Sequence, residues 1–339
     1  MENDALAARV GPWMESVEPY LPPLASLAKE FTALTGVPVD LPTALFLRAQ
    51  LMGHALPGRT STGGSCHLLE AADGWTAVNL ARPDDLAAVP ALVALLSGSE
   101  AEPLPEVAER STAAEVAARA QFLGIAAAEH ASASGRSPVR AERLGERHVR
   151  DPRSLRIVDL SALWAGPLCA RLLGLAGAQV VKVESATRPD GARAGSPAFY
   201  RWLHDGHDSL VLDFASGALA EVVAGADVVI EASRARALRR LGVHAEEFLA
   251  ARPGRVWVSI TGYGRDDDRI AFGDDAAVAG GLTGLDAHGD PVFLGDALAD
   301  PVTGIYAAHA TAHSLATGGG ELLSLSMSAC AASLVPSPC

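Results

Sequence analysis

The feature that most restricts the fold of this chain is the alternation of apolar and helix-like segments from Leu155 onward. The apolar segments are short, continuous and rich in Val, Ile and Leu, and helical segments of small residues separate them. This pattern is typical of βαβ units, in which helices cover both faces of a parallel sheet. Strands are predicted at residues 155–161, 179–185, 209–214, 227–233, 254–264 and 321–328.

The N-terminal part of the chain has a different pattern. The segment HLLEAADGWTAVNLA predicts a β-hairpin with its turn at Asp73–Gly74, and residues 112–124 have the pattern of an amphipathic helix capped by Thr112. A chain of 339 residues is long enough for two domains. We predict an α/β protein with four parts: a helical segment at 1–60 that packs on the large domain, a small α+β domain at 61–130, a connector at 131–154, and a large domain with a doubly wound, Rossmann-like parallel sheet at 155–335.

Composition and charge argue against several classes of partner. Hydrophobic residues make up 49% and charged residues 20%, which is typical of a globular protein. The formal net charge of -13 argues against binding to nucleic acid or to an anionic membrane surface. No apolar run approaches the roughly 20 residues of a membrane helix. We expect a cytoplasmic protein, because no signal peptide is recognised and the four cysteines lack metal-type spacing: Cys66, Cys169, Cys330 and Cys339.

Residues that follow the predicted strands are candidate ligand contacts, because ligands of parallel sheets bind beyond the carboxyl ends of the strands. After the first strand, Ala165 and Gly166 permit a close approach to the backbone, and the following helix offers free N–H groups to an anion. The absence of a GxGxxG pattern there disfavours a nicotinamide dinucleotide. The loop after the second strand, which is either an ordinary solvated loop or part of the site, supplies Glu184, Arg188, Asp190 and Arg193.

Arginines are concentrated after the fourth predicted strand of the large domain. Helical spacing places Arg236 on one face with Arg239 and Arg240. A salt-bridged surface is one interpretation, but this segment has no acidic residues at the matching positions. A patch that faces phosphate groups is the better interpretation of Arg234, Arg236, Arg239 and Arg240.

Two aspartates, Asp296 and Asp300, lie in the otherwise small and apolar segment LGDALADPVTGIYAAHA. One interpretation is structural, because Asp caps helices and Pro301 suits the first helical position. The other is chemical, because ionised carboxylates are seldom buried without a partner or a function. Together with the cations above, the two aspartates predict a site for a phosphorylated ligand with a carboxylate as acid, base or nucleophile.

Several motifs in sequence resemble the class III coenzyme A transferases, the family of formyl-CoA transferase, carnitine CoA-transferase and α-methylacyl-CoA racemase. They are IVDLSALWAGPLCARLLGLAGAQVVKVE, DGAR, DSLVLDF, ADVVIEASRARALRRLGV, VWVSITGYG and LADPVTGIYAAH, in the family's order across roughly residues 155–330. The segment STGGSCHLLEAADGWTAVNLARPDD resembles the family's small domain, which usually follows a segment like ELLSLSMSACAASL. The resemblance therefore implies a circularly permuted order.

The resemblance implies that Asp300, followed four residues later by Gly304, is the catalytic aspartate. In such transferases the aspartate forms a mixed anhydride with the acyl group and then a thioester with CoA. The resemblance implies no tightly bound cofactor, with CoA, acyl-CoA and a carboxylic acid as substrates, and an interlocked homodimer. It places the glycine loop at Gly63 and Gly64 and the CoA contacts at Leu163, Trp164, Ala165, Arg193, Arg240 and Tyr263.

Departures from the family pattern leave alternatives open. The segment GHDS stands where the family has two cations, and Ser185 stands where formyl-CoA transferase-like proteins have an arginine. The histidine of the racemase branch would fall at Asp274, which favours transferase chemistry. The alternatives are a racemase, epimerase or isomerase that uses Asp300 as a base, and a non-catalytic acyl-CoA-binding homologue. The thioester carrier is CoA or another pantetheine compound.

Overall fold

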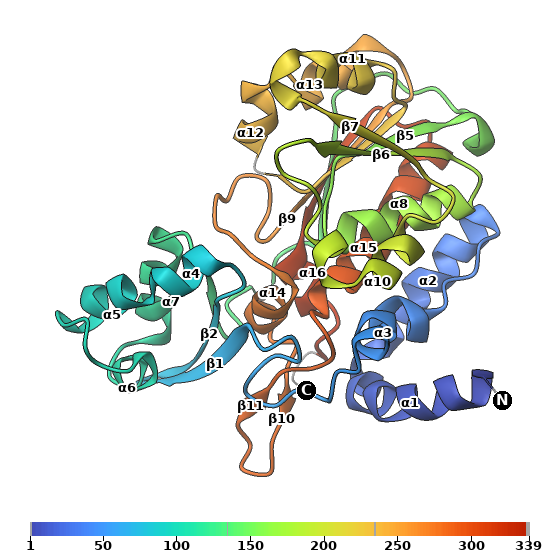
Figure 1. The fold of residues 1–339 in the computed structure, drawn as a ribbon. Helices are drawn as coiled ribbons and strands as arrows, with labels where there is room; N and C mark the ends of the chain where they lie inside the picture. Colours follow the sequence, from blue (N-terminus) through green and yellow to red (C-terminus); the bar gives the residue numbers. More distant parts are fainter. Residues whose placement is uncertain (1, 134, 234, 337–339) are drawn as a thin grey trace.

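A computed structural model describes residues 2–133, 135–233 and 235–336. Its largest feature is a seven-stranded sheet in the order β4-β12-β9-β8-β5-β6-β7 (Figure 1). Neighbouring strands are parallel except for β4, which is antiparallel to β12. The strands are β4 (Val139–Arg143), β5 (Arg156–Asp159), β6 (Gln179–Ser185), β7 (Asp208–Leu212), β8 (Val228–Glu231), β9 (Val256–Thr261) and β12 (Glu321–Ser326).

Helices connect the parallel strands of this sheet. A small hairpin, β10 (Gly284–Leu285) and β11 (Pro291–Val292), lies between the last two connecting helices. The helices are α8 (Ala165–Leu175), α9 (Ala192–Gly195), α10 (Pro197–Leu203), α11 (Ala218–Ala224), α12 (Ala235–Arg240), α13 (Ala245–Ala251), α14 (Gly273–Ala279) and α15 (Ala299–Ala316), and α16 (Met327–Ala332) follows β12.

Both faces of the sheet are covered, which explains why its strands are continuously apolar. Ile157 of β5 belongs to a hydrophobic cluster with residues of α8 and α15. Its neighbour Val158 belongs to a second cluster with residues of α11 and α13. Successive residues of a strand point to opposite faces, so a strand buried on both faces needs apolar residues at both. The predicted doubly wound α/β fold is confirmed, and the six predicted strands are present within small differences of boundary.

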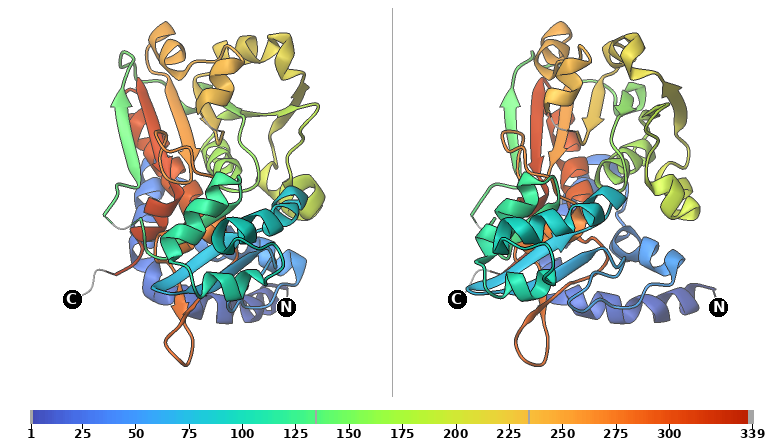
Figure 2. Two further views of the ribbon diagram at one scale, coloured as in Figure 1. Left: turned by 90° about the vertical axis from the view of Figure 1, so that its left-hand side faces the viewer. Right: turned by 60° about the vertical axis from the view of Figure 1, so that its left-hand side comes forward.

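The segment predicted as a connector, residues 131–154, contributes an edge strand to the sheet. Its strand β4 pairs with β12 from Val139, opposite Leu325, to Arg143, opposite Glu321. Figure 2 shows the two strands side by side, β4 in green and β12 in red. Most side chains of β4 are exposed and charged, so the sequence has no apolar alternation to indicate a strand. Charges at an exposed sheet edge disfavour pairing with other chains.

Three helices precede the small sheet: α1 (Glu2–Val17), α2 (Leu21–Thr35) and α3 (Leu41–Met52). Phe31 of α2 and Phe46 of α3 are fully buried in the same hydrophobic cluster as α8 and α15. The N-terminal helices thus extend the core of the large sheet, as the blue helices beside α8 and α15 show (Figure 1). This packing places α3 close to the start of α15.

A second, smaller sheet has the order β1-β2-β3 and lies against α14. The predicted hairpin is present, and the side chain of Thr112 accepts a hydrogen bond from Glu115 N at 3.2 Å at the start of the predicted helix. Cys66 and Ala77 of this sheet share a buried cluster with Val278 of α14. The elements are β1 (Cys66–Ala71), β2 (Gly74–Asn79), β3 (Ala126–Glu129), α4 (Pro83–Ala87), α5 (Val89–Ser97), α6 (Leu104–Ala108) and α7 (Ala113–Phe122).

None of the helices in the described part of the chain is both long and apolar enough to cross a membrane.

Candidate active site

Asp300 is in the first turn of α15, and it does not cap the helix. The helix begins at Ala299, with Leu298 in the N-cap position, so the structural interpretation of Asp300 as a helix cap is wrong. The chain turns sharply before the helix because Ala297 has a φ of 47°. The half-buried Asp300 carboxylate lies against Gly273 at the start of α14, where a Cβ atom would collide with Asp300 Oδ2.

Gly304 brings this first turn of α15 close to the N-terminus of α8. A Cβ atom at Gly304 would lie 2.7 Å from the carbonyl oxygen of Ala165 and 3.0 Å from Cβ of Leu168. Residues four apart lie on one face of a helix, so the same face presents Asp300 to α8. The backbone N–H of Ala165 interacts with the Asp300 carboxylate there and lowers its pKa. The structure therefore gives a packing reason for the spacing of Asp300 and Gly304.

Asp274 and Asp296 surround Asp300 with negative charge. Asp296 is fully buried, and Asp274 is buried and accepts a hydrogen bond from Ala297 N at 3.1 Å. Burial raises the pKa of Asp300 to about 7, and the neighbouring carboxylates of Asp274 and Asp296 contribute to this rise. Burial, and then the charge of Asp296, raise the pKa of Asp274 to about 6. Asp300 and Asp274 can therefore exchange protons near neutral pH.

Arg48 of α3 is the partner that the buried Asp296 requires, and the sequence analysis missed it. Arg48 Nε donates to Asp296 Oδ2 at 2.8 Å, and Arg48 Nη2 donates to Asp296 Oδ1. The guanidinium also lies over the ring of Trp164, with Cζ 4.7 Å from the ring centroid. The one signal in the sequence was an arginine in an otherwise uncharged helix, LPTALFLRAQLM. Its partner is 248 residues away, which no local pattern could indicate.

The predicted glycine loop is joined to the acidic cluster through Ser61. Gly63 and Gly64 are exposed, and a Cβ atom at either position would have no atom of the described residues within 4 Å. Gly64 N donates to the Ser61 carbonyl at 2.8 Å and has a φ of 80°, which favours glycine. The Ser61 side chain is hydrogen-bonded to Asp274 and accepts from Cys66 N at 3.0 Å. The loop is therefore anchored to α14 at its base.

Asp275, next to Asp274, joins α14 to the smaller sheet. Its Oδ1 accepts from Asn79 Nδ2 of β2 and from Phe272 N, both at 3.0 Å. Burial raises its pKa to about 7. Asp275 thus has a structural role at the contact between β2 and α14.

Leu163, Trp164 and Ala165, which were predicted to contact CoA, form the turn from β5 into α8. Leu163 has a φ of 69°, and its N–H donates to Asp190 Oδ1 at 3.0 Å. Asp190 is in turn paired with the buried Lys182 at 3.1 Å. Leu163 is partly exposed, whereas Trp164 and Ala165 are buried, so Leu163 is the one of these three residues that is open to a ligand.

The predicted phosphate contacts are partly occupied by carboxylates of this chain. Arg193 pairs with Glu184 at 2.6 Å, although 44% of its side chain is exposed. On α12, Arg236 pairs with Asp268 at 3.3 Å and Arg239 pairs with Glu246 at 2.8 Å. These acidic partners come from other segments, which the local spacing could not show. Arg240 is exposed at the end of α12, and Arg234 lies outside the described residues.

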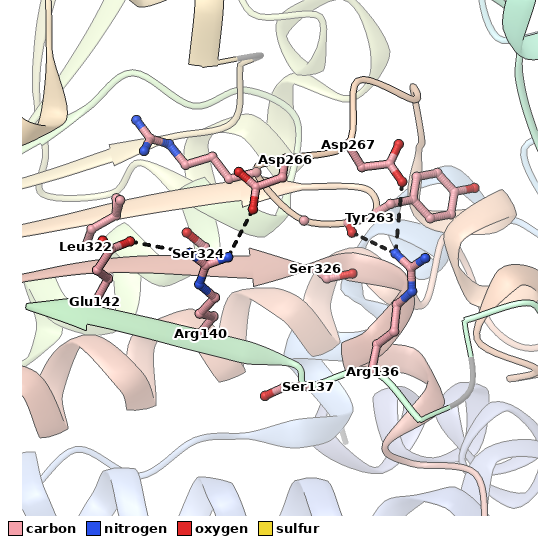
Figure 3. A pocket seen from close by; sticks show the side chains of 12 residues that line it. Arg136, Ser137, Arg140, Glu142, Tyr263, Asp266, Asp267, Leu322, Ser324 and Ser326 are labelled. Carbon is pink, nitrogen blue, oxygen red and sulfur yellow. Dashed lines mark hydrogen bonds and ion pairs between the residues drawn. The ribbon is translucent and has the colours of Figure 1, made fainter.

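Tyr263, the last predicted CoA contact, is buried beside a separate cavity. Burial raises its pKa, and the guanidinium of Arg269 lies 3.7 Å from the centroid of its ring. The cavity measures about 510 Å³ and lies beside β4 and β12 (Figure 3). Arg136 and Arg140 point into it, each in contact with carboxylates. Asp274, Asp296 and Asp300 do not line this cavity, so Tyr263 borders a cavity that is separate from the acidic cluster.

No group of three or more His, Cys, Asp or Glu side chains is arranged to hold a metal ion among residues 2–133, 135–233 and 235–336. The acidic cluster instead has an arginine as its cation.

Comparison with known proteins identifies the class to which this fold and site belong. A family model described as CoA-transferase family III matches residues 153–338, and the chain belongs to that family. The predicted family is confirmed. The matched range contains Asp274, Asp296 and Asp300, whereas Arg48 and Ser61 lie outside it. The circular permutation stays a prediction.

Individual relatives each match about half of the chain. It is 28% identical over 199 residues to succinate–glutarate CoA-transferase of Agrobacterium fabrum, covering 51% of this chain and 50% of that protein. It is 31% identical over 207 residues to the succinyl-CoA–L-malate CoA-transferase beta subunit of Chloroflexus aurantiacus, covering 54% and 51%. The chain thus spans about half the length of the curated relatives it matches. A crystal structure of a CAIB/BAIF family protein from Brucella suis aligns with a TM-score of 0.50 at 27% identity, covering 55% of each chain.

Proposed function

We propose that this protein transfers CoA from an acyl-CoA to a carboxylic acid, with Asp300 as the nucleophile. The observation that carries the proposal is the position of Asp300. Its carboxylate lies between Gly273 and the N-terminus of α8, in a chain that belongs to CoA-transferase family III. Relatives named for succinyl-CoA make succinyl-CoA the first donor to test.

In the first half of the reaction, an Asp300 carboxylate oxygen attacks the thioester carbonyl carbon. The C–S bond breaks, CoA leaves as a thiolate, and a mixed anhydride of Asp300 and the acyl group remains. The thiolate then attacks the Asp300 carbonyl carbon. This step releases the donor acid as a carboxylate and leaves Asp300 joined to CoA as a thioester, so the thioester bond energy is retained.

In the second half, the acceptor carboxylate attacks the Asp300 thioester and expels the CoA thiolate. The thiolate attacks the acceptor carbonyl of the new anhydride, which produces the acceptor acyl-CoA and restores the Asp300 carboxylate. Each attack places negative charge on a carbonyl oxygen. The positive end of α8 at Ala165 and the exposed glycine loop are suited to stabilise that charge. In the loop the N–H of Gly63 is the donor, because Gly64 N already donates to the Ser61 carbonyl.

For CoA itself we propose contacts at the turn of Leu163, Trp164 and Ala165, with Arg193 and Arg240 facing the phosphates. The exposed charges of the two arginines support this assignment, since guanidinium groups bind phosphate oxygens strongly. Tyr263 is assigned by the resemblance and stays a prediction. So do the homodimer and the lack of a tightly bound cofactor.

The experiment that tests the proposal is peptide mass spectrometry after the protein is mixed with acyl-CoAs and then with hydroxylamine. Hydroxylamine converts an aspartyl anhydride or thioester into a hydroxamate. We expect a hydroxamate at Asp300, none in Asp300→Ala, and an unchanged signal in Asp205→Ala, which removes an exposed aspartate. Comparable CoA transfer by folded Asp300→Ala would refute the role of Asp300.

A second candidate is isomerisation at the carbon next to the thioester carbonyl. The observation in its favour is that Asp274 and Asp300 have pKa values of about 6 and 7, suited to proton transfer at neutral pH. Uptake of deuterium from solvent into that carbon, without acyl exchange or hydroxamate, would support it. Binding of acyl-CoA without either reaction would identify a non-catalytic homologue.

A further inference from the structure

Arg48 lies outside the range that the family model matches, yet it completes the acidic cluster. The Arg48 guanidinium donates to both carboxylate oxygens of Asp296, through Nε at 2.8 Å and through Nη2. Asp296 is fully buried. A bidentate pair of this kind fixes the orientation of both groups as well as their separation.

The guanidinium of Arg48 is also held on its flat face. It lies over the buried ring of Trp164, 4.7 Å from the centroid, and Trp164 immediately precedes Ala165 at the start of α8. Asp296 lies four residues before Asp300 in the chain. Arg48 therefore links the two segments between which Asp300 is positioned.

The groups that act on Asp300 come from four elements. Asp274 of α14 and Asp296 of the loop before α15 contribute negative charge, and Ala165 of α8 contributes a backbone N–H group. The cation is Arg48 of α3. Carboxylates crowded into a poorly hydrated site repel one another and favour protonation, so an ionised nucleophile there depends on a nearby positive charge.

We propose that Arg48 is a positioning residue for Asp300: its paired and stacked guanidinium holds Asp296 in place and favours the ionised form of Asp300 among the neighbouring carboxylates. The proposal deepens the proposed function, because it assumes that the ionised form of Asp300 is the reactive one. It also makes α3, which precedes the matched family range, a part of the active site.

The test is a titration of Asp300 by ¹³C NMR in protein labelled at the aspartate carboxyl carbons. The resonance is identified by its loss in Asp300→Asn. In Arg48→Met we expect the midpoint to rise by about one pH unit or more. In Arg48→Lys, which keeps the charge, we expect it to stay close to that of the wild type. The matched control is Arg110→Met, which removes the exposed ion-pair partner of Glu102 in the part of the chain that carries the smaller sheet.

Arg48→Met leaves a buried charge without a partner and can fail to fold, so a double variant is included. Arg48→Met with Asp296→Asn removes both charges of the pair, and we expect its midpoint between those of Arg48→Met and the wild type. The pH at which hydroxamate formation reaches half of its maximal rate should follow the same order among the variants. A wild-type midpoint in the double variant, or a rise in Arg48→Lys equal to that in Arg48→Met, would overturn the proposal. The titration requires no catalysis, so it tests the role of Arg48 by itself. Absence of a hydroxamate would refute the proposed function, whatever the titration shows.

Discussion

The Oδ2 atom of Asp300 occupies the space in which Gly273 would carry its side chain. The contact joins the first residue of α14 to the first turn of α15, and it brings Asp274 close to Asp300. The absence of a side chain at position 273 is therefore a requirement of the site. The first prediction follows from this contact.

Gly273→Ala should lower CoA transfer at least about tenfold, because the added methyl group displaces the Asp300 carboxylate or moves α14 away from it. The new Cβ atom would also collide with the carbonyl oxygen of Ala297. The measurement is the rate of acyl exchange with the fold checked by circular dichroism. Gly195→Ala is the control, since its Cβ would meet no atom within 4 Å. Full activity in Gly273→Ala would contradict the position of Asp300.

The rate of Asp300 acylation should rise with pH through about 7. Asp300 must be ionised to attack, and burial holds its pKa at about 7, so the reactive fraction is small at pH 5 and nearly complete at pH 9. Asp274→Asn removes a negative charge beside Asp300 and should move the profile to lower pH. Single-turnover hydroxamate formation measures both profiles. A profile without a step between pH 5 and 9 would argue against this assignment, and Asp205→Asn should leave it unchanged.

Asp275→Asn should stabilise the protein at alkaline pH while leaving transfer close to that of the wild type. The folded-state pKa of Asp275, about 7, is above its ordinary value of 3.8. Its contribution to stability is therefore fully present below about pH 4 and is lost as pH rises through about 7. The amide, which has no charge to bury, should gain roughly 1–3 kcal/mol relative to the aspartate between pH 4 and pH 8. Chemical denaturation at pH 4 and pH 8 measures the free energy of unfolding of both proteins. An equal effect of Asp275→Asn on that free energy at both pH values would contradict the prediction.

Arg240→Gln should raise KM for the acyl-CoA about fivefold to tenfold with kcat nearly unchanged. The guanidinium is exposed at the end of α12, and loss of one phosphate contact costs about 1 to 1.5 kcal/mol. Arg239→Gln is the matched control, because Arg239 is already paired with Glu246. Steady-state kinetics at several salt concentrations measure both variants. A larger rise in KM for Arg239→Gln than for Arg240→Gln would assign the phosphate contact to Arg239 instead.

The large sheet could be predicted from sequence because burial on both faces leaves a continuous apolar signal, as at Ile157 and Val158. The edge strand β4 could not, since its side chains are mostly exposed and charged. Local spacing also gave the wrong cap for α15, because the sharp turn at Ala297 moves the helix start to Ala299. The propensity of Asp to cap a helix depends on the local sequence alone, whereas here tertiary contacts determine where the helix begins.

The candidate site was predictable only where its residues follow one another in the chain. Asp300 and Gly304 are a local pair, and their spacing has a packing reason in α8. Arg48 meets Asp296 across 248 residues, and the arginines of α12 find carboxylates on other segments. Such pairs depend on the completed fold, so neither spacing nor composition could reveal them.

The distance in sequence between Arg48 and Asp296 has a consequence for how the protein matures. During synthesis α3 leaves the ribosome long before Asp296 has been translated, and N-terminal segments generally begin to fold first. Until α15 arrives, Phe46 has no finished core to enter and Arg48 has no acid to bind. If Asp300 is the nucleophile and Arg48 positions it, as proposed above, the site is complete only after both segments have docked.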